Sequence, residues 1–147
     1  AQKFYDDYLA CFPGVAAKRE WYQDHARRWG FVQTFTGRYR RLGKAKSRSR
    51  IERARAMRQA VNAPIQGGAH DIVKAAMQKC ENSRKLKELG CTLRIQVHDE
   101  FGFSCPKETA EEAAAIIKKK MEDPLPYRLL VPLVTEPTIV VRWGLAK

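Results

Sequence analysis

This sequence has no long apolar run, and that absence argues against a helical membrane protein. All of its apolar runs are shorter than the roughly 18 residues that a membrane-spanning helix requires. No positively charged segment followed by an apolar one opens the chain, so secretion is not indicated. The first residue is Ala1 rather than Met, which we interpret as a chain that is processed, trimmed or only partly present.

Closely spaced cysteines are also absent. The cysteines are Cys11, Cys80, Cys91 and Cys105. They form no C-x-x-C pair, and their gaps match no zinc module. The three histidines are likewise too scattered to predict a metal cluster from spacing alone. The simplest interpretation is an intracellular protein with reduced cysteines.

Acidic residues are scarce, at 16 Asp and Glu against 28 Lys and Arg, which leaves a net charge of +12 and a pI of about 9.8. Such a balance predicts a polyanionic partner, most simply nucleic acid. A merely soluble basic protein is the alternative that composition leaves open. The 147 residues are enough for one domain with its own core, and a hydrophobic content of 44% argues against a disordered chain.

The positive charge is concentrated between residues 38 and 58, where Glu52 is the only acid. The ten cations of this basic run are Arg38, Arg40, Arg41, Lys44, Lys46, Arg48, Arg50, Arg53, Arg55 and Arg58. Its first part contains Gly43 and Ser47 and predicts a flexible loop, and its second part leads into a helix. A solvated charged face is the usual meaning of such a run, but the shortage of acids favours contact with phosphates.

Hydrophobic periodicity predicts an α+β chain. We expect helices over 2–12, 15–29 and 51–79 and after residue 106, and strands over 31–35, 93–97, 101–105, 129–134 and 139–141. Pro64 falls inside the long helix and predicts a kink. Gly67 and Gly68 leave the helix backbone bare, so another chain can approach it closely.

The segment Gln96–Glu100 lies between two alternating apolar runs, the pattern of a tight hairpin. The pattern puts Leu93, Ile95 and Val97 on one side before the turn. It puts Phe101, Phe103 and Cys105 on one side after it. The tip would carry His98 and Asp99, and a carboxylate there is well placed to hold a hard cation against a phosphate.

Arg58, Asn62 and Gln66 are spaced four residues apart on the long helix. At about 100° per residue they drift only ~80° around the axis and form one ridge. Arginine and carboxamide side chains suit the acceptor-rich minor groove, where they would check duplex geometry with little sequence preference. An ordinary exposed helix face has the same spacing, and spacing alone does not separate the two.

Several of these segments resemble the family A DNA polymerases, the group that includes bacterial DNA polymerase I. The stretch 58–77 resembles their long palm helix, and Gln96–Glu100 matches their motif C. Phe12–Val15, Gly30–Thr34 and Gly37–Leu42 resemble the end of the fingers and the segment after it. Val131–Leu133 and Trp143-Gly144 resemble the closing strand and tail, so the resemblance spans nearly the whole chain.

The resemblance implies a role for each candidate residue. Asp99 would be one of two aspartates that hold catalytic Mg²⁺, and Glu100 would lie beside it or contact the metal weakly. His98 would touch the primer terminus. Arg58, Asn62 and Gln66 would contact the minor groove of the primer–template DNA, and a dNTP would be the second substrate. Of the basic run, we select Arg38, Arg40 and Arg41 as further DNA-binding residues.

Two family motifs have no counterpart in this sequence. No stretch resembles motif A, which carries the second metal-binding aspartate, because Asp6-Asp7-Tyr8 is embedded in a helical stripe. The motif B helix, which grips the nucleotide, would precede Ala1. Either the chain is one subunit of a split polymerase, or it is a fragment of a longer one. In both cases an N-terminal polymerase chain carrying motifs A and B must complete the site.

The expected organisation is the end of the fingers at 1–43, a basic linker at 44–50 and the C-terminal palm at 51–147. We expect a cytoplasmic location, in the nucleoid or in a viral replication complex. Two other functions stay open. The pairs His70-Asp71 and His98-Asp99 are reminiscent of HD-type metal phosphohydrolases, although further ligands are missing. The chain could also be a non-catalytic remnant that binds duplex DNA.

Overall fold

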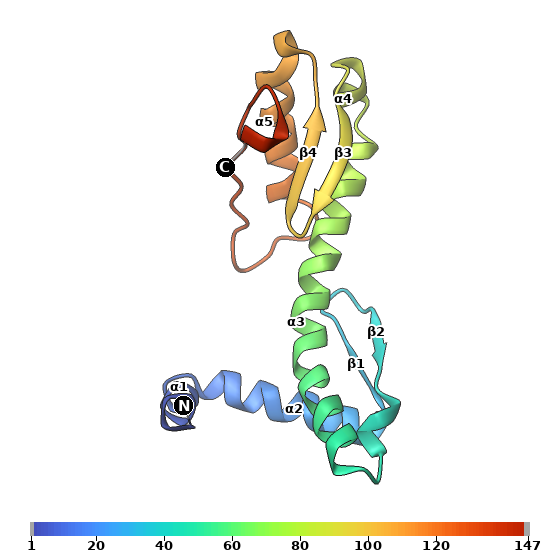
Figure 1. Cartoon of the computed structure of the whole chain (residues 1–147), viewed down its shortest axis with the longest axis vertical. Helices are drawn as coiled ribbons and strands as arrows, with labels where there is room; N and C mark the ends of the chain where they lie inside the picture. The colour runs from blue at the N-terminus through green and yellow to red at the C-terminus, as the bar shows by residue number, and fades with distance from the viewer. Residues whose placement is uncertain (1, 146–147) are drawn as a thin grey trace. The chain divides into compact units, whose positions relative to one another are not determined.

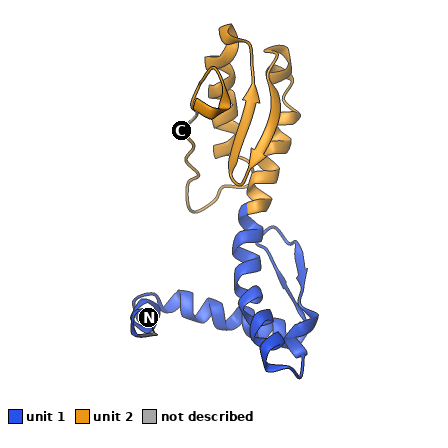
Figure 2. Ribbon diagram, viewed as in Figure 1, with its two compact units in different colours: residues 1–69 blue, residues 70–147 orange. Residues whose placement is uncertain are grey.

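The structure, a computed structural model, describes residues 2–145 and divides into two compact units (Figures 1 and 2). The first unit spans residues 1–69 and the second spans residues 70–147. The long helix α3, Arg50–Glu81, contributes residues to both. Of the helices in the described part of the chain, none has the length and apolar character that crossing a bilayer requires.

The first unit opens with two helices, α1 Gln2–Cys11 and α2 Pro13–Trp29. Pro13 occupies the first turn of α2, where its missing N–H breaks no helical hydrogen bond, so α2 begins two residues earlier than predicted. Gly30 ends α2 in the left-handed conformation, at φ 74°, and donates its N–H to the Ala26 carbonyl at 2.9 Å. Both predicted helices are confirmed.

A small antiparallel ribbon follows, made of β1 Phe31–Gln33 and β2 Tyr39–Arg41. The 3₁₀ turn η1, Gly43–Lys46, leads from β2 into α3. The strand at β1 was predicted, whereas β2 and η1 replace the predicted flexible loop. The core of this unit is built mainly from small side chains: Ala26, Val32, Leu42, Ala45, Ala56, Met57 and Ala60.

The predicted long helix is confirmed as α3, with Pro64 buried inside it. The kink expected at Pro64 stays a prediction. A close approach is present at Gly67 and Gly68, but the approaching segment is the β1–β2 turn of the same chain rather than another chain. A Cβ added at Gly67 would lie 2.8 Å from Thr34 Cγ2, and one at Gly68 would lie 2.7 Å from the Phe35 ring.

The second unit contains α4 Arg84–Glu88, the hairpin β3 Thr92–Val97 and β4 Glu100–Ser104, and α5 Ala110–Glu122. In Figure 1 the hairpin lies beside α5, which the 3₁₀ turn η2, Lys107–Thr109, precedes. The core of the unit is Cys80, Leu86, Leu89, Cys91 and Ala113, with Phe103, Cys105, Ile116 and Ile117 packed against it. Burial raises the pKa of the Cys80 thiol to about 11 and that of Cys91 to about 12, so both are protonated at neutral pH.

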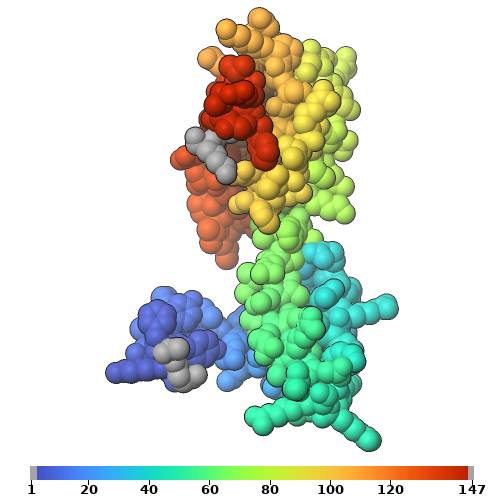
Figure 3. Space-filling view, viewed as in Figure 1, coloured from blue at the N-terminus to red at the C-terminus, as the bar shows by residue number. Residues whose placement is uncertain are grey.

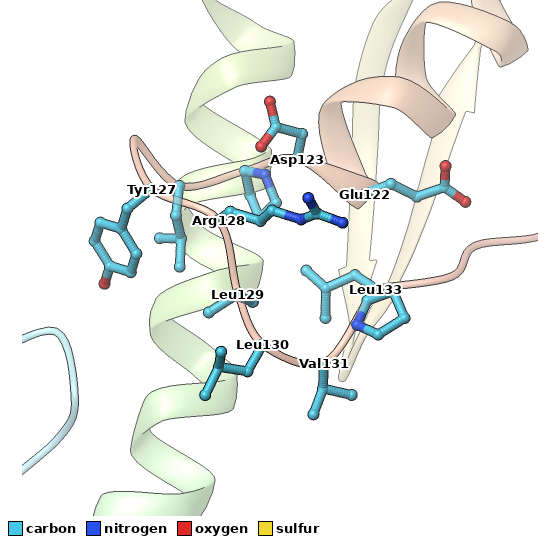
Figure 4. Close-up of a pocket in the computed structure, with 11 residues that line it drawn as sticks. Glu122, Asp123, Tyr127, Arg128, Leu129, Leu130, Val131 and Leu133 are labelled. Carbon is cyan, nitrogen blue, oxygen red and sulfur yellow. The ribbon is translucent and has the colours of Figure 1, made fainter.

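The two strands predicted over 129–134 and 139–141 are wrong, because the structure assigns no strand to either segment. Figure 4 shows the chain turning after α5 around an open hollow, with Leu130 and Val131 projecting away from it. Leu130 and Val141 are fully exposed. A β-rich composition makes a strand only where a partner strand supplies the ladder, and no partner pairs with these segments in the described residues.

Thr135 anchors this irregular segment to α5. Its backbone N–H donates to Glu122 Oε1 at 3.0 Å. That hydrogen bond, with a smaller contribution from Lys118, lowers the pKa of the Glu122 carboxyl. The assignment of residues 1–43, 44–50 and 51–147 to fingers, linker and palm stays a prediction, since a division into compact units does not test it.

Candidate active-site hairpin and nucleic-acid interface

The hairpin that carries the motif C residues is confirmed as two antiparallel strands joined by a two-residue turn. Its register pairs Val97 with Glu100, Gln96 with Phe101 and Leu93 with Phe103. Between Leu93 and Ile95 the register shifts by one residue, so Arg94 is the extra residue of a β-bulge. The Arg94 Nε donates to Ser104 Oγ at 2.8 Å, which ties the bulge to β4.

The bulge corrects the predicted alternation of β3. Residues opposite each other in a ladder share a face, so Leu93 lies on the face of Phe103 and Phe101. Ile95 and Val97 lie on the other face, with Gly102 and Glu100, and the prediction that they share a side with Leu93 is wrong. An unbroken strand has a period of two, and one extra residue reverses its phase.

Gly102 is explained by the same register. A Cβ added there would lie 2.6 Å from Ile95 Cγ2, so the side chain of Ile95 covers the bare backbone of Gly102. Phe101 and Phe103 stand edge to face, with ring centroids 6.3 Å apart, and Phe103 packs against the core of the unit. The hairpin therefore has one face anchored in the core.

The turn at the tip is held in a specific backbone conformation. His98 has a φ of 55°, which a side chain rarely adopts outside a turn. The carboxamide of Gln96 donates to the His98 carbonyl oxygen and supports this turn. Sequence reasoning missed this positioning role of Gln96, whose only sequence signal is a carboxamide placed directly before the turn.

The carboxylates of Asp99 and Glu100 face solvent. Both residues are exposed, and neither forms a salt bridge within residues 2–145. Two unpaired carboxylates at adjacent positions suit a hard divalent cation. Among the described residues, however, no group of three His, Cys, Asp or Glu side chains could hold a metal ion together.

This arrangement fits half of a metal site. Asp99 offers an accessible oxygen atom, but the described residues do not by themselves complete a metal site. The same finding gives no support to an HD-type phosphohydrolase, because that class needs several His and Asp ligands around its metal. His98 and Asp99 sit on a turn rather than on the helices that such a site uses.

The predicted ridge on α3 is exposed along its length. Arg58, Asn62 and Gln66 all face solvent in the first unit. Ala56 and Ala60 of the same helix are buried in the core with β1 and η1, which fixes the rotation of α3. The ridge is thus presented by a helix whose opposite face is packed.

The three arginines selected on the β1–β2 ribbon differ in role. Arg40 and Arg41 belong to β2 and are exposed. Arg38 reaches α3 instead, where its Nη2 donates to the Gly67 carbonyl at 3.0 Å. Thr34 accepts the backbone N–H of Arg38 at its Oγ1, at 3.1 Å, which fixes the base of that side chain. Arg38 therefore joins the ribbon to the helix, whatever else it contacts.

Glu52, the only acid of the basic run, is hydrogen-bonded to two residues of the same segment. Glu52 accepts hydrogen bonds from Lys44 Nζ and Ser47 Oγ, each at 2.6 Å, and these bonds lower the pKa of its carboxyl. Arg53 Nη1 donates to the Ser47 carbonyl at 2.9 Å. The remaining cations form no salt bridge within the described residues: Arg40, Arg41, Lys46, Arg48, Arg50, Arg55 and Arg58. Figure 3 shows long side chains standing out from this part of the surface.

Comparison with known proteins finds similarity in sequence over nearly the whole chain. The family model described as DNA polymerase family A matches residues 1–145. The thermostable DNA polymerase I of Thermus aquaticus is 40% identical over 147 residues, which are 100% of this chain and 17% of the relative. DNA polymerase I of Deinococcus radiodurans is 38% identical over 136 residues, which are 92% of this chain and 14% of the relative.

A solved structure has the same fold. It is the POL domain of Pol1 from M. smegmatis in complex with DNA primer-template and dNTP. The TM-score is 0.80 at 36% sequence identity, and the match covers 88% of this chain and 22% of that chain. This chain therefore spans about a sixth of the length of the curated relatives it matches.

Proposed function

Because the chain belongs to the family A DNA polymerases, we propose that it takes part in template-directed addition of dNTPs to a DNA primer. The observation that carries this proposal is the exposed Asp99 at a hairpin tip, which forms no salt bridge with any described residue, in a chain whose residues 1–145 match the family. The activity is that of a nucleotidyltransferase, and its substrates are a primer–template and a dNTP.

The chain needs a partner polypeptide for this reaction. It spans 17% of the Thermus aquaticus relative, and its sequence has no counterpart of motif A. A single carboxylate holds a hydrated divalent ion weakly. A polypeptide with motifs A and B would supply the second aspartate and the nucleotide-gripping side chains. It would be a separate subunit or another part of a longer chain.

Asp99 would hold Mg²⁺ jointly with that second aspartate, and Glu100 would support it from the adjacent ladder position. Mg²⁺, when bound, lowers the pKa of the primer hydroxyl and stabilises the charge that develops on the transferred phosphate. His98 is placed beside Asp99 by the left-handed turn and would contact the primer terminus. Each of these residues would act by position and charge, because proteins catalyse phosphoryl transfer mainly by positioning the reactants and stabilising charge.

Arg58, Asn62 and Gln66 would bind the minor groove of the primer–template, and the unpaired cations of the basic run would bind its phosphates. Minor-groove acceptors occur at every base pair, so such contacts hold any sequence. Arg40 and Arg41 form no salt bridge in the part of the chain that the structure describes and would be available for phosphates, whereas Arg38 already bonds to the Gly67 carbonyl.

Reconstitution tests the function directly. The chain would be mixed with the polypeptide that carries motifs A and B, a primed template, dNTPs and Mg²⁺, and primer extension would be followed on a gel. We expect extension by the mixture and none by either polypeptide alone, because each holds one of the two metal-binding aspartates. Absence of extension by the mixture, with both polypeptides folded and bound to each other, would reject the catalytic proposal.

We expect Arg58→Ala and Gln66→Ala each to weaken primer–template binding by about 5- to 10-fold, equally on several sequences, since a hydrogen bond to a charged or polar partner contributes about 1–1.5 kcal/mol. Anisotropy with a labelled duplex would measure this, at fixed salt. Lys87→Ala, an exposed cation on α4, is the control and should change binding little. An effect confined to particular sequences would contradict minor-groove binding.

A duplex-binding protein without catalytic activity is the second candidate. The absence of a complete metal site among the described residues favours it, together with the uncompensated cations. Under this alternative Asp99 and Glu100 are only turn residues, and the binding experiment succeeds while the reconstitution fails. The two experiments together therefore separate the two functions.

A further inference from the structure

A row of aromatic rings lies on the outer surface of the first unit, and neither the hairpin nor the α3 ridge accounts for it. The row consists of Trp21, His25, Trp29, Phe31 and Tyr39. Trp21 stacks on His25 at 5.1 Å between ring centroids, and His25 meets the edge of Phe31 at 5.1 Å. Phe31 in turn lies 4.9 Å from Tyr39, and Trp29 lies 6.5 Å from His25.

Helix spacing and strand register build this aromatic row. Trp21, His25 and Trp29 are four residues apart on α2, so each turns only about 40° from the last. In the ribbon, Phe31 pairs with Arg41 and Tyr39 pairs with Gln33, which puts all four on one face. Val32 occupies the other face and is buried in the core, so the aromatic face points to solvent.

The rings are far more exposed than core rings would be. Trp21, Trp29 and Tyr39 keep 52%, 66% and 61% of their surface accessible. Burying such large apolar faces is normally favourable, and an exposed patch of this kind marks a binding surface. Contacts among the rings hold them in place without covering them.

Positive charge borders the aromatic row. Lys18 Nζ lies 4.4 Å from the centroid of the Trp21 ring, and Arg41 stands opposite Phe31 in the ribbon. Glu20 and Asp24 are the acids of α2. Around the helix axis they point at least about 60° away from the rings of the aromatic row. Asp24 is also in a salt bridge with Arg27, at 2.6 Å. The partner that fits this surface is therefore flat, aromatic and anionic.

We propose that the aromatic row is a stacking platform for single-stranded nucleic acid. Unpaired bases offer an aromatic face, and every base stacks, so the row would bind any sequence. Lys18 and Arg41, which border the row, would bind the phosphates. A duplex keeps its bases stacked on one another and cannot use the rings. This site goes beyond the proposed function, because it lies on α2 and the ribbon and requires no catalysis.

The first test is selective binding by the whole 147-residue chain. The probe is a fluorescent oligothymidylate of about twenty nucleotides, which forms little structure of its own. Trp143→Phe removes the only tryptophan outside the aromatic row, so fluorescence then reports Trp21 and Trp29. We expect the single strand to bind and to quench this fluorescence, and a blunt duplex to leave it unchanged. Binding without quenching would overturn the proposal.

Substitutions at Trp21 distinguish stacking from apolar docking of a protein segment. We expect Trp21→Leu to weaken binding of the single strand by at least about fivefold, the lower range for one lost stacked base, and Trp21→Phe to keep most of it. Phe4→Leu removes a ring on α1 that is more exposed than Trp21, at 79% against 52%, and is the control, expected to bind as the parent does. Full binding by Trp21→Leu would overturn the proposal, since leucine is apolar but cannot stack.

The duplex experiment separates this site from the proposed function. Trp21→Leu should leave binding of the blunt duplex unchanged, whereas Arg58→Ala should weaken binding of the duplex alone. Circular dichroism would verify that each variant is folded. A loss of both binding modes in folded Trp21→Leu would mean that the row is no separate site and would overturn the proposal.

Discussion

Replacing Asp99 with alanine is expected to reduce primer extension by the reconstituted enzyme by about a thousandfold or more. A metal ligand that stabilises transition-state charge contributes several kcal/mol, and about 4 kcal/mol corresponds to a factor of a thousand in rate. Duplex binding should persist, because the ridge and the cations that would make it lie in the first unit. Gel-based extension at saturating Mg²⁺ and anisotropy with the same primer–template would measure the two properties.

Glu136→Ala is the matched control for this substitution. Glu136 is also an exposed carboxylate, so the variant has the same charge change away from the hairpin tip. We expect it to extend primers normally. Glu100→Ala should lose less activity than Asp99→Ala, since Glu100 is assigned a supporting position. Full extension by Asp99→Ala would reject its assignment as a metal ligand and leave the duplex-binding alternative.

Gly67→Ala is expected to destabilise the first unit by about 1–2 kcal/mol. The added Cβ would stand 2.8 Å from Thr34 Cγ2 and 2.9 Å from Arg38 Nη2, closer than van der Waals contact allows. Thr34 is buried, and its hydroxyl is hydrogen-bonded to that of Thr36 at 2.8 Å, so its side chain cannot easily move away from the added Cβ. Overpacking of this kind costs about 1–3 kcal/mol, which exceeds the gain of up to about 1 kcal/mol from replacing a helical glycine. Urea unfolding followed by circular dichroism would measure the change.

Two further variants sharpen this prediction. Gly14→Ala also replaces a helical glycine, in the first turn of α2, but no heavy atom lies within 4 Å of the added Cβ, so we expect no loss and a gain of up to about 0.5 kcal/mol. Thr34→Ser removes the obstructing methyl group and keeps the hydroxyl, and combined with Gly67→Ala it should restore part of the lost stability. If Gly14→Ala and Gly67→Ala changed the free energy of unfolding equally, the close approach at Gly67 would make no contribution to stability.

The sequence predicted those elements whose signals are local. The 3.6-residue periodicity of apolar residues, together with Pro13 and Gly30 at the helix ends, located the first helices. The alternation of apolar and polar residues around Gln96–Glu100 located the hairpin. The bare backbone at Gly67 and Gly68 predicted a close contact. The residues proposed for the site were selected mainly because their order and spacing resemble a family, which periodicity could not have supplied; their roles stay predictions.

The failures have physical causes that are not local. Residues 129–134 have the composition of a strand, but a ladder needs a second strand, and none pairs with them in the described residues. The strand β2 lies in a segment that Gly43 and Ser47 predicted to be a flexible loop, although its pairing with β1 depends on backbone groups. The role of Arg38 on the Gly67 carbonyl depends on a contact across 29 residues, and the charge pattern gave no sign of it.

The direction in which the hairpin tip faces depends on the number of residues in β3, because Arg94 is a single extra residue in that strand. Upstream of it the strand is in phase with the core through Leu93, and downstream every side chain has changed sides. Removing one residue from β3 would turn the tip over by half a rotation and present Asp99 to the opposite side, with every amino acid of the motif intact. Substitutions along this strand change the stability of the hairpin, whereas a change in its length would change the side to which Asp99 points.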